Sequence, residues 1–321
     1  MPDFRHACMA RQRTGGAWLH RLALLTASAT LVLIFVGGLV TNTGSALAVP
    51  DWPTTFGYSM FLYPWSRMVG GIFYEHSHRL IGSVVGLLTV TLAIWIWIEE
   101  SRRWLRWLGA AAVMAVIVQG VLGGLRVILI SNGTTIAIIH GCLAQAFFAL
   151  TVSVALFTSQ GWKQDSEQIP AAEAGRLRPL SLLTTGLIAL QIIAGAILVH
   201  TGLLLNLHLL LAVLVTIHVS MLGARVFRRL PDEGRLVRPV IVLCSLLLLQ
   251  LLLGLGLYVG RFTSFQLPDG ALTGLALPIT HRIAGAGMLA TCLVLTLRAH
   301  RRAPSVTRVV GRMVASEGVP A

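Results

Sequence analysis

Charge is scarce in this sequence, and negative charge is scarcest. Asp, Glu, Lys and Arg together make up 12% of the 321 residues, against roughly 25% in soluble proteins. Hydrophobic residues make up 55% of the chain, and its mean hydropathy is +0.79. This composition excludes a water-soluble enzyme. Basic residues outnumber acidic ones 25 to 12, an excess that would fit nucleic-acid binding unless the positions of the charges explain it.

Cysteine is also rare, and its placement excludes two kinds of site. Cys8 lies near the N-terminus, and Cys142, Cys244 and Cys292 fall within long apolar stretches. No disulfide can therefore form between the outer loops that connect these stretches. The sequence has no C-x-x-C-H motif, which excludes a covalently attached c-type haem.

Long apolar stretches are what the sequence has instead. A helix needs about 20 apolar residues to cross a bilayer, and eight stretches qualify: 22–40, 80–98, 108–125, 134–157, 180–199, 203–224, 240–260 and 275–297. We therefore predict an all-α integral membrane protein with eight transmembrane helices. Ala46-Leu47-Ala48 resembles a signal-peptide cleavage site, but the 19-residue first stretch exceeds the usual apolar core of about 7 to 15 residues.

The positions of the basic residues explain the charge excess. Twenty of the 25 lie in the N-terminal segment, in the second, fourth and sixth connections, and in the C-terminal tail. By the positive-inside rule, both termini are cytoplasmic and the protein is a multi-pass component of the inner (plasma) membrane. The excess is then an orientation signal, and no nucleic-acid partner is expected. Apart from the lipid bilayer, nothing in the sequence identifies a partner for the basic tail.

An internal repeat separates the ten histidines into two groups. The matched pairs lie 130 to 141 residues apart: Gln119 with Gln250, Gly123 with Gly254, His78 with His208, and His140 with His281. The repeat predicts two parallel four-helix bundles, an N-terminal half (1–160) and a C-terminal half (161–298), followed by a basic cytoplasmic tail (299–321). The other histidines have no counterpart and are interpreted as structural or interfacial: His6, His20, His76, His200, His218 and His300.

The four repeated histidines are predicted to bind iron. Each lies near the outer end of its helix, and at 1.5 Å per residue they share one depth. Two imidazoles at one depth in a four-helix bundle can hold a haem iron from both faces. A single such histidine would be better explained as a hydrogen-bonded interfacial residue, but four in a repeated pattern favour a haem or a metal. Zinc is disfavoured because two histidines per half, without nearby thiolates or carboxylates in each of the two halves, leave its coordination incomplete.

One carboxyl breaks the symmetry of the repeat. Glu75 lies three residues before His78, on the same helix face, and its counterpart in the second half is Leu205. Because a carboxyl near the hydrocarbon boundary is costly, we interpret Glu75 as a proton-transfer group; a carboxylate stabilised by a helix N-terminus is the simpler alternative. Three outer-side arginines are candidates for contacts with haem propionates or for snorkelling anchors: Arg79, Arg126 and Arg282.

Taken together, these motifs resemble the haem A synthase family. The resemblance covers roughly residues 20–298 and rests on Gly37-Gly38-Leu39-Val40-Thr41, Thr43-Gly44-Ser45, Pro50-Asp51-Trp52-Pro53, Glu75-His76-Ser77-His78-Arg79-Leu80-Ile81-Gly82, Gln119-Gly120, Gly123-Gly124-Leu125-Arg126-Val127, His208 and His281-Arg282. It implies an oxidoreductase that converts the C8 methyl group of haem O to a formyl group, giving the haem A of cytochrome oxidase. His78 and His140 would then bracket the substrate haem beside the catalytic Glu75, and His208 and His281 would bind a haem b cofactor.

The resemblance also implies partners, and one departure from the family bears on them. Haem O would come from a haem O synthase, and electrons would pass to an unidentified partner, for which quinone is a candidate; a homo-oligomer is left open. Many bacterial members have a cysteine pair in the first outer loop, whereas residues 41–73 contain none. A thiol-based electron route is therefore excluded there.

Two other functional classes fit parts of the sequence. The main alternative is a dihaem b-type electron carrier linked to quinone, which explains the histidine pairs but gives no role to Glu75 or to the loop around Asp51. A transporter built from two parallel repeats is disfavoured because few charges lie along any path through the membrane.

Overall fold

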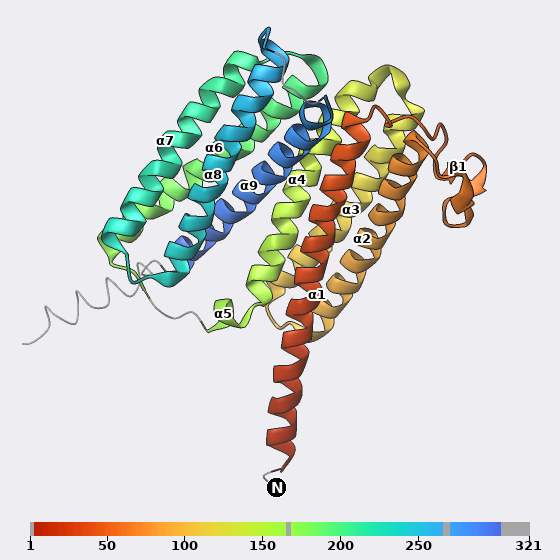
Figure 1. Ribbon diagram of the computed structural model, residues 1–321. Coiled ribbons are helices and arrows are strands. Elements are labelled where there is room, and N and C mark those ends of the chain that lie inside the picture. Colours follow the sequence, from red (N-terminus) through yellow and green to blue (C-terminus); the bar gives the residue numbers. More distant parts are fainter. Residues whose placement is uncertain (1–2, 165–167, 266–269, 303–321) are drawn as a thin grey trace, which may run out of the picture.

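In the computed structural model, long helices run side by side in one bundle, and the structure describes residues 3–164, 168–265 and 270–302 (Figure 1). Within this part, eight helices are long and apolar enough to cross a membrane. They are α1 (Asp3–Asn42, with its apolar span at Gly16–Asn42), α2 (Gly71–Glu99), α3 (Arg103–Ile128), α4 (Gly133–Thr158), α6 (Ala171–Thr201), α7 (Leu205–Arg229), α8 (Gly234–Phe262) and α9 (Leu277–Arg301). The predicted all-α class with eight apolar helices is confirmed, and the chain is a multi-pass membrane protein.

Short elements connect these helices. The α1–α2 connection contains the antiparallel strands β1 (Thr54–Thr55) and β2 (Tyr58–Ser59), followed by the 3-10 turns η1 (Met60–Leu62) and η2 (Trp65–Arg67). The other short elements are η3 (Ile130–Asn132), α5 (Gln160–Lys163) and a π turn, η4 (Leu272–Ala276), that leads into α9. Figure 1 shows the β1–β2 hairpin projecting beside one end of α2.

A single carboxylate organises the hairpin turn. Phe56 and Gly57 have φ angles of +50° and +78°, the positive values that a two-residue hairpin turn requires. Asp51 accepts hydrogen bonds from the N–H groups of both residues, at 2.7 and 2.8 Å, and from the Thr54 hydroxyl. Partial burial opposes ionisation of Asp51, but these hydrogen bonds outweigh it and lower its pKa from the ordinary value. The carboxylate form therefore stabilises the turn.

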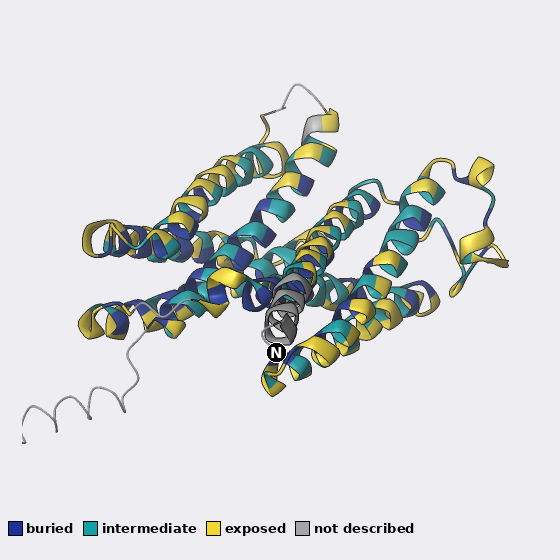
Figure 2. Ribbon diagram, turned by 90° about the horizontal axis from the view of Figure 1, so that it is seen from below, coloured by how far each residue is buried: buried dark blue, intermediate teal, exposed yellow. Residues whose placement is uncertain are grey.

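Each side of the bundle has its own buried core. Figure 1 shows α1–α4 together on one side and α6–α9 on the other. The core of α6–α9 includes Leu177 and Leu243, and that of α1–α5 includes Ile96 and Leu105, all completely buried. Apolar residues that remain exposed lie on the outer faces of the helices (Figure 2). Because hydrocarbon tails solvate such faces, this exposure is what a membrane-spanning bundle requires.

Small residues of α9 bring the two groups of helices together. Ala286 and Ala290 pack with Ile34 of α1 and Phe148 of α4 in one buried cluster. In the most apolar segment of the span that contains α9, half of the residues are buried, against 11% in the corresponding segment of α8. The helix α9 therefore lies deepest in the bundle, and α8 lies at its periphery. Close approach of backbones at small residues is the usual basis of helix packing in membranes.

The second helix extends beyond its apolar stretch. The apolar stretch begins at residue 80, whereas α2 begins at Gly71, nine residues earlier. The added turns contain Glu75 and His76, which are only 5% and 1% exposed. Hydropathy excludes these polar residues, but contacts with the first connection satisfy them, as described below, so the helix extends through them. Glu75 and His78 therefore lie inside the helix rather than at its edge.

Candidate functional site

Each of the four repeated histidines lies within two turns of the start of its helix and faces a glycine of the preceding long helix. A methyl group added at the glycine would lie 3.0 to 3.6 Å from the ring Cε1: Gly37 of α1 faces His78 of α2, Gly123 of α3 faces His140 of α4, Gly195 of α6 faces His208 of α7, and Gly254 of α8 faces His281 of α9. The same contact thus occurs in four helix pairs. At Gly37 and Gly195 the added methyl would be too close, at 3.0 Å, whereas at Gly254 and Gly123 it would make an ordinary contact, at 3.4 and 3.6 Å.

A glutamine precedes three of these glycines by four residues. Gln191 and Gln250 place their amide Nε2 atoms 3.3 Å from the ring Nε2 of His208 and of His281. Because an amide nitrogen can only donate, the imidazole nitrogen accepts in both contacts. Gln119 instead donates to the backbone carbonyl of His140, at 3.1 Å. Leu33 occupies the corresponding position in α1, so no such amide faces His78.

The rings of the second histidine pair are spaced to bracket a metal. The centroids of His208 and His281 are 6.4 Å apart, with an angle of 59° between the ring planes. A metal–nitrogen bond of about 2 Å on each side fits between two rings at this separation. His78 and His140 also lie close enough to interact electrostatically. The structure therefore brings both predicted pairs together.

Unsatisfied ring nitrogens test whether these pairs fit a haem. The Nδ1 atoms of all four histidines are buried and have no hydrogen-bond partner among the described residues. Such groups are rare in native proteins unless a water or a ligand completes the site. Within the same part of the chain, no group of three or more His, Cys, Asp or Glu side chains could hold a metal ion. Paired imidazoles without further ligands fit a haem iron, whose equatorial ligands come from the porphyrin.

Glu75 is enclosed by the first connection. Its Oε2 accepts the N–H of Val49 at 2.9 Å, and its Oε1 accepts from Arg79 at 2.8 Å. Arg79 also donates to the carbonyls of Val49, Asp51 and Thr54, at 2.7 to 3.0 Å. Both carboxyl oxygens thus have donors, and one guanidinium ties the start of α2 to the hairpin. Contact between Arg79 and a haem propionate, as the sequence suggested, would compete with these bonds.

His76 is held by the same connection. Its Nδ1 lies 3.1 Å from the Thr55 hydroxyl, and its ring packs on Tyr63, with the centroids 5.2 Å apart. These contacts agree with the structural role expected from its lack of a counterpart in the repeat.

Two arginines gather between the two groups of helices. Arg126, in the last turn of α3, lies close enough to Glu75 and to Arg282 of α9 to interact with both electrostatically. His200, at the end of α6, lies near both arginines. Among the described residues, neither guanidinium has a hydrogen-bond or ion-pair partner. Two partly buried guanidinium groups without a hydrogen-bond or ion-pair partner among the described residues suit a ligand that carries carboxylates.

Several residues of the site were missed from sequence. The Gln-x-x-x-Gly spacing of Gln119 and Gly123 recurs at Gln191 and Gly195. A search for this spacing would therefore have identified the glutamine and the glycine of α6 as candidate site residues. Gly37 begins one of the family-like motifs, but its contact with His78 depends on how α1 packs against α2. No sequence signal identifies the Val49 amide as a partner of Glu75, because every residue except proline has that group.

Comparison with known proteins places this architecture among named relatives. Residues 20–208 match the family model COX15-CtaA, described as a cytochrome oxidase assembly protein. A haem A synthase of Shouchella clausii is 33% identical over 152 residues, covering 47% of this chain and 48% of that protein. A haem A synthase of Bacillus licheniformis is 31% identical over 152 residues, 47% of each chain. One from Exiguobacterium sibiricum is 25% identical over 187 residues, 57% of this chain and 60% of that protein.

These matches have a limited extent. The chain matches only about half the length of the first two of these curated relatives. The family match ends at His208, so it includes the first histidine pair but leaves His281 outside. The family match therefore does not extend to His281, whose position opposite His208 is given by the structure.

Proposed function

The chain belongs to the COX15-CtaA family of cytochrome oxidase assembly proteins, and from that premise we propose that it is a haem A synthase. It would act on haem O and convert one methyl group to the formyl group of haem A. The observation that carries this proposal is the buried carboxyl of Glu75, three residues before His78 and 5% exposed. A carrier that only passes electrons needs no such group beside one of its two histidine pairs.

The two histidine pairs are proposed to hold different haems. His78 and His140 would bind the substrate, haem O, and His208 and His281 would bind haem b, which supplies one-electron redox chemistry. The glutamines distinguish the two pairs. Gln191 and Gln250 contact the ring nitrogens of the second pair, and neither ring of the first pair has such a contact. These amides would turn away from the ring nitrogens for the imidazoles to bind iron, because a lone pair that accepts a hydrogen bond is not free for a metal.

Glu75 is proposed to handle protons and to orient the reacting methyl group. Conversion of a methyl to a formyl proceeds through two successive oxidations, and each releases protons. Within the eight spans, Glu75 is the only acidic residue at the histidine end. Its hydrogen bonds to Val49 and Arg79 hold the carboxyl in one position, and this preorganisation favours directed proton transfer.

Arg126 and Arg282 are proposed to bind haem propionates. Their guanidinium groups are suited to carboxylates, and they lie between the two groups of helices, beside both histidine pairs. His200 would add a third polar contact at the same place. Arg79 would contribute indirectly, by holding the first connection over the substrate side.

The same proposal includes the orientation and the partners. The halves 1–160 and 161–298 would be parallel repeats with both termini and the basic tail in the cytoplasm, which puts the histidine end on the outer side of the inner membrane. A haem O synthase would deliver the substrate, and a quinone is the candidate electron partner.

Fusions to alkaline phosphatase, which is active only outside the cytoplasm, test the orientation. A fusion within the first connection should be active, and a fusion at residues 230–234 should be inactive. The reverse pattern would contradict the orientation.

Glu75→Gln tests the proposed activity. The variant is co-expressed with a source of haem O, and the extracted haems are identified by mass. We expect the haems to remain bound while haem A is absent and haem O or its alcohol accumulates. Normal formation of haem A by this variant would contradict the assignment, and haem B as the sole haem in the unmodified chain would favour the dihaem electron carrier.

A control separates chemistry from loop structure. Asp51→Asn weakens the same connection through its hairpin turn but leaves Glu75 unchanged, so we expect it to retain haem A formation. In parallel, His281→Ala should remove the b-type absorbance and leave the first histidine pair intact. An unchanged spectrum would mean that haem b lies elsewhere.

A further inference from the structure

Large apolar side chains are exposed on the connection between α1 and α2. Phe61 and Leu62 lie on η1, Trp65 begins η2, Val69 follows it, and Phe73 lies in the first turn of α2. Each of these five residues is between 52% and 77% exposed. We call them the loop patch. Single exposed apolar residues are ordinary, but such a concentration marks a surface that contacts something other than water.

The same connection has a second side that packs on the bundle. Val49 and Thr55 are completely buried, and Tyr63 and Met68 are nearly so. The Tyr63 ring packs on His76 of α2, with the centroids 5.2 Å apart. The connection is therefore attached to α2, and the exposure of the loop patch does not come from a detached loop.

Charge is almost absent from this segment. From Trp52 to Tyr74, Arg67 is the only charged residue. Its guanidinium donates to the Tyr58 hydroxyl at 3.1 Å and lies 5.7 Å from the centre of that ring. Aromatic rings with polar tips, and arginines that reach outward from them, are typical of the boundary between membrane and water. The segment thus has the composition of an aromatic membrane belt.

The position of the connection places the loop patch at the level of the lipid headgroups. The helix α2 has 29 residues and is about 44 Å long at 1.5 Å per residue, which matches the roughly 40–45 Å of a bilayer with its headgroups. Figure 1 shows the β1–β2 hairpin projecting sideways from the first turns of α2, rather than beyond the end of the bundle. A segment beside the end of such a helix lies within the headgroup region.

The loop patch also continues the lipid-facing surface of α2. Phe73, Val84 and Leu87 are all exposed, and spacings of 11 and 14 residues place them on one face of the helix. Glu75, which is buried, lies on the opposite face. The lipid-facing stripe of α2 therefore reaches the start of the helix, where η1 packs against it.

Other connections at this end of the bundle are apolar as well. Ile130, in the α3–α4 connection, and Leu203, in the α6–α7 connection, are both exposed. At the opposite end, the α7–α8 connection exposes Asp232. Exposed apolar residues in separate connections at one end indicate an apolar medium around that end, rather than one local protein partner.

We propose that the loop patch inserts into the headgroup and upper acyl region of the adjacent membrane leaflet. Phe61, Leu62 and Trp65 would lie among the first acyl carbons, and Arg67 would reach the lipid phosphates. The connection would then be held on two sides, by Arg79 toward α2 and by lipid away from it. This inference rests on the membrane-spanning fold and is independent of the proposed haem chemistry.

Spin labels on the full chain in phosphatidylcholine nanodiscs test this contact. A nitroxide is attached to a single cysteine, Leu62→Cys or Trp65→Cys. Molecular oxygen partitions into lipid and a nickel chelate stays in water, so the ratio of their collision rates with the nitroxide reports its surroundings. The native cysteines outside the buried core are first changed to alanine: Cys8, Cys142 and Cys244.

Two further labels calibrate the ratio. Leu248→Cys, exposed at the middle of α8, gives the value for lipid, and Asp232→Cys gives the value for water. We expect the oxygen-to-nickel ratio at Leu62 and at Trp65 to exceed that at Asp232 by about threefold or more, toward the value at Leu248. A ratio equal to that at Asp232 would overturn the proposal and leave a surface for a protein partner. Shielding of both labels from both reagents would indicate a second copy and would equally overturn it.

A matched pair of substitutions tests whether the apolar side chains make the contact. Leu62→Asp is added to the Trp65→Cys label, and Leu203→Asp, at the same end but in another connection, is the control. Because a carboxylate is costly to place in lipid, the ratio should fall to the Asp232 value in the first variant and stay unchanged in the second. The thermal unfolding midpoint verifies that each variant is folded. No fall with Leu62→Asp, or an equal fall in the control, would overturn the assignment to the loop patch.

Discussion

Arg79 and Glu75 form a buried ion pair of 2.8 Å, one turn apart on α2. The same guanidinium donates to three carbonyls of the first connection, and Glu75 accepts the amide of Val49 from that connection. The carboxyl proposed to serve the chemistry is therefore also part of what attaches the loop to the bundle. Variants of either residue have to be judged against loop structure as well as activity.

Arg79→Gln should release the first connection. The substitution removes the partner of a buried carboxyl and three carbonyl contacts, which we expect to destabilise the protein by about 3 kcal/mol. Trypsin cleavage after the exposed Arg67 measures the release, because this site lies within the connection. Faster cleavage is expected in Arg79→Gln, and the control Arg21→Gln, on α1, should cleave as the unmodified chain does. Unchanged cleavage in Arg79→Gln would show that other contacts hold the loop.

Gly195→Ala should weaken haem binding by the second histidine pair. The added methyl would lie 3.0 Å from Cε1 of His208, so the ring must shift, and displacing a metal ligand costs on the order of tenfold in affinity. The haem content of purified protein, measured as the pyridine complex, is the readout. Gly186→Ala on the same helix is the control, because nothing lies within 4 Å of its added methyl. Equal haem content in both variants would mean that the glycine contact does not position the ring.

Gly124→Ala should disrupt the packing of the first connection on α3. A methyl at this position would lie 2.3 Å from the Trp52 ring, and overpacking of this kind typically costs about 1–3 kcal/mol. The thermal unfolding midpoint should fall in Gly124→Ala and recover in part in Gly124→Ala/Trp52→Ala. Gly120→Ala, with open space around its methyl, should be near neutral. Absence of recovery in the double variant would place the strain elsewhere.

The hairpin turn should loosen in acid. The pKa of Asp51 is lowered in the folded protein: burial opposes its ionisation, but hydrogen bonds from Gly57, Thr54 and Phe56 prevail. Its contribution to stability is therefore fully present above the ordinary carboxyl pKa of about 4 and is lost as the pH falls through the lower folded value. Amide hydrogen exchange at Phe56 and Gly57, corrected for intrinsic rates, should lose protection over this range. The same step in Asp51→Asn would show that another group titrates.

Local sequence specifies the spans because hydropathy sums over some 20 neighbouring residues, and all eight predicted stretches are helices in the structure. The histidine pairs were also predictable, since the repeat places chemically distinctive side chains at matched positions. The start of α2 was not predictable from hydropathy, because Glu75 and His76 count against a membrane helix until their partners in the first connection are known.

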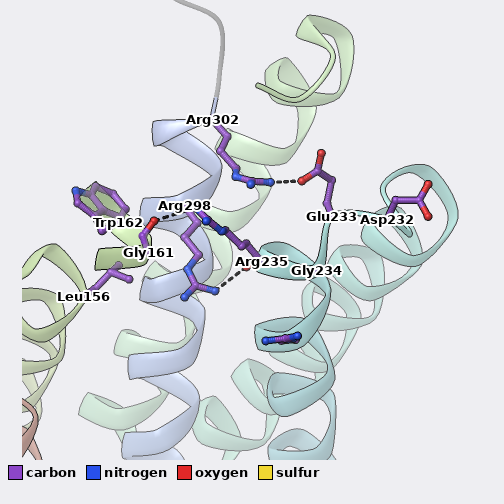
Figure 3. Close-up of a pocket in the computed structure, with 10 residues that line it drawn as sticks. Leu156, Gly161, Trp162, Asp232, Glu233, Gly234, Arg235, Arg298 and Arg302 are labelled. Carbon is purple, nitrogen blue, oxygen red and sulfur yellow. Dashed lines mark hydrogen bonds and ion pairs between the residues drawn. The ribbon is translucent and has the colours of Figure 1, made fainter. Parts of the chain in front are cut away.

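Only the tertiary structure decided which groups contact the repeated histidines and Arg79. The glycine that faces each histidine lies on a different helix, and the carbonyls that bind Arg79 belong to the backbone, which carries no residue-specific signal. The bond from Arg235 of α8 to the Gly161 carbonyl of α5 likewise depends on where these two helices meet (Figure 3). Sequence alone therefore determined which residues could do chemistry and how often the chain crosses the membrane, whereas packing between distant segments decided which of those residues meet.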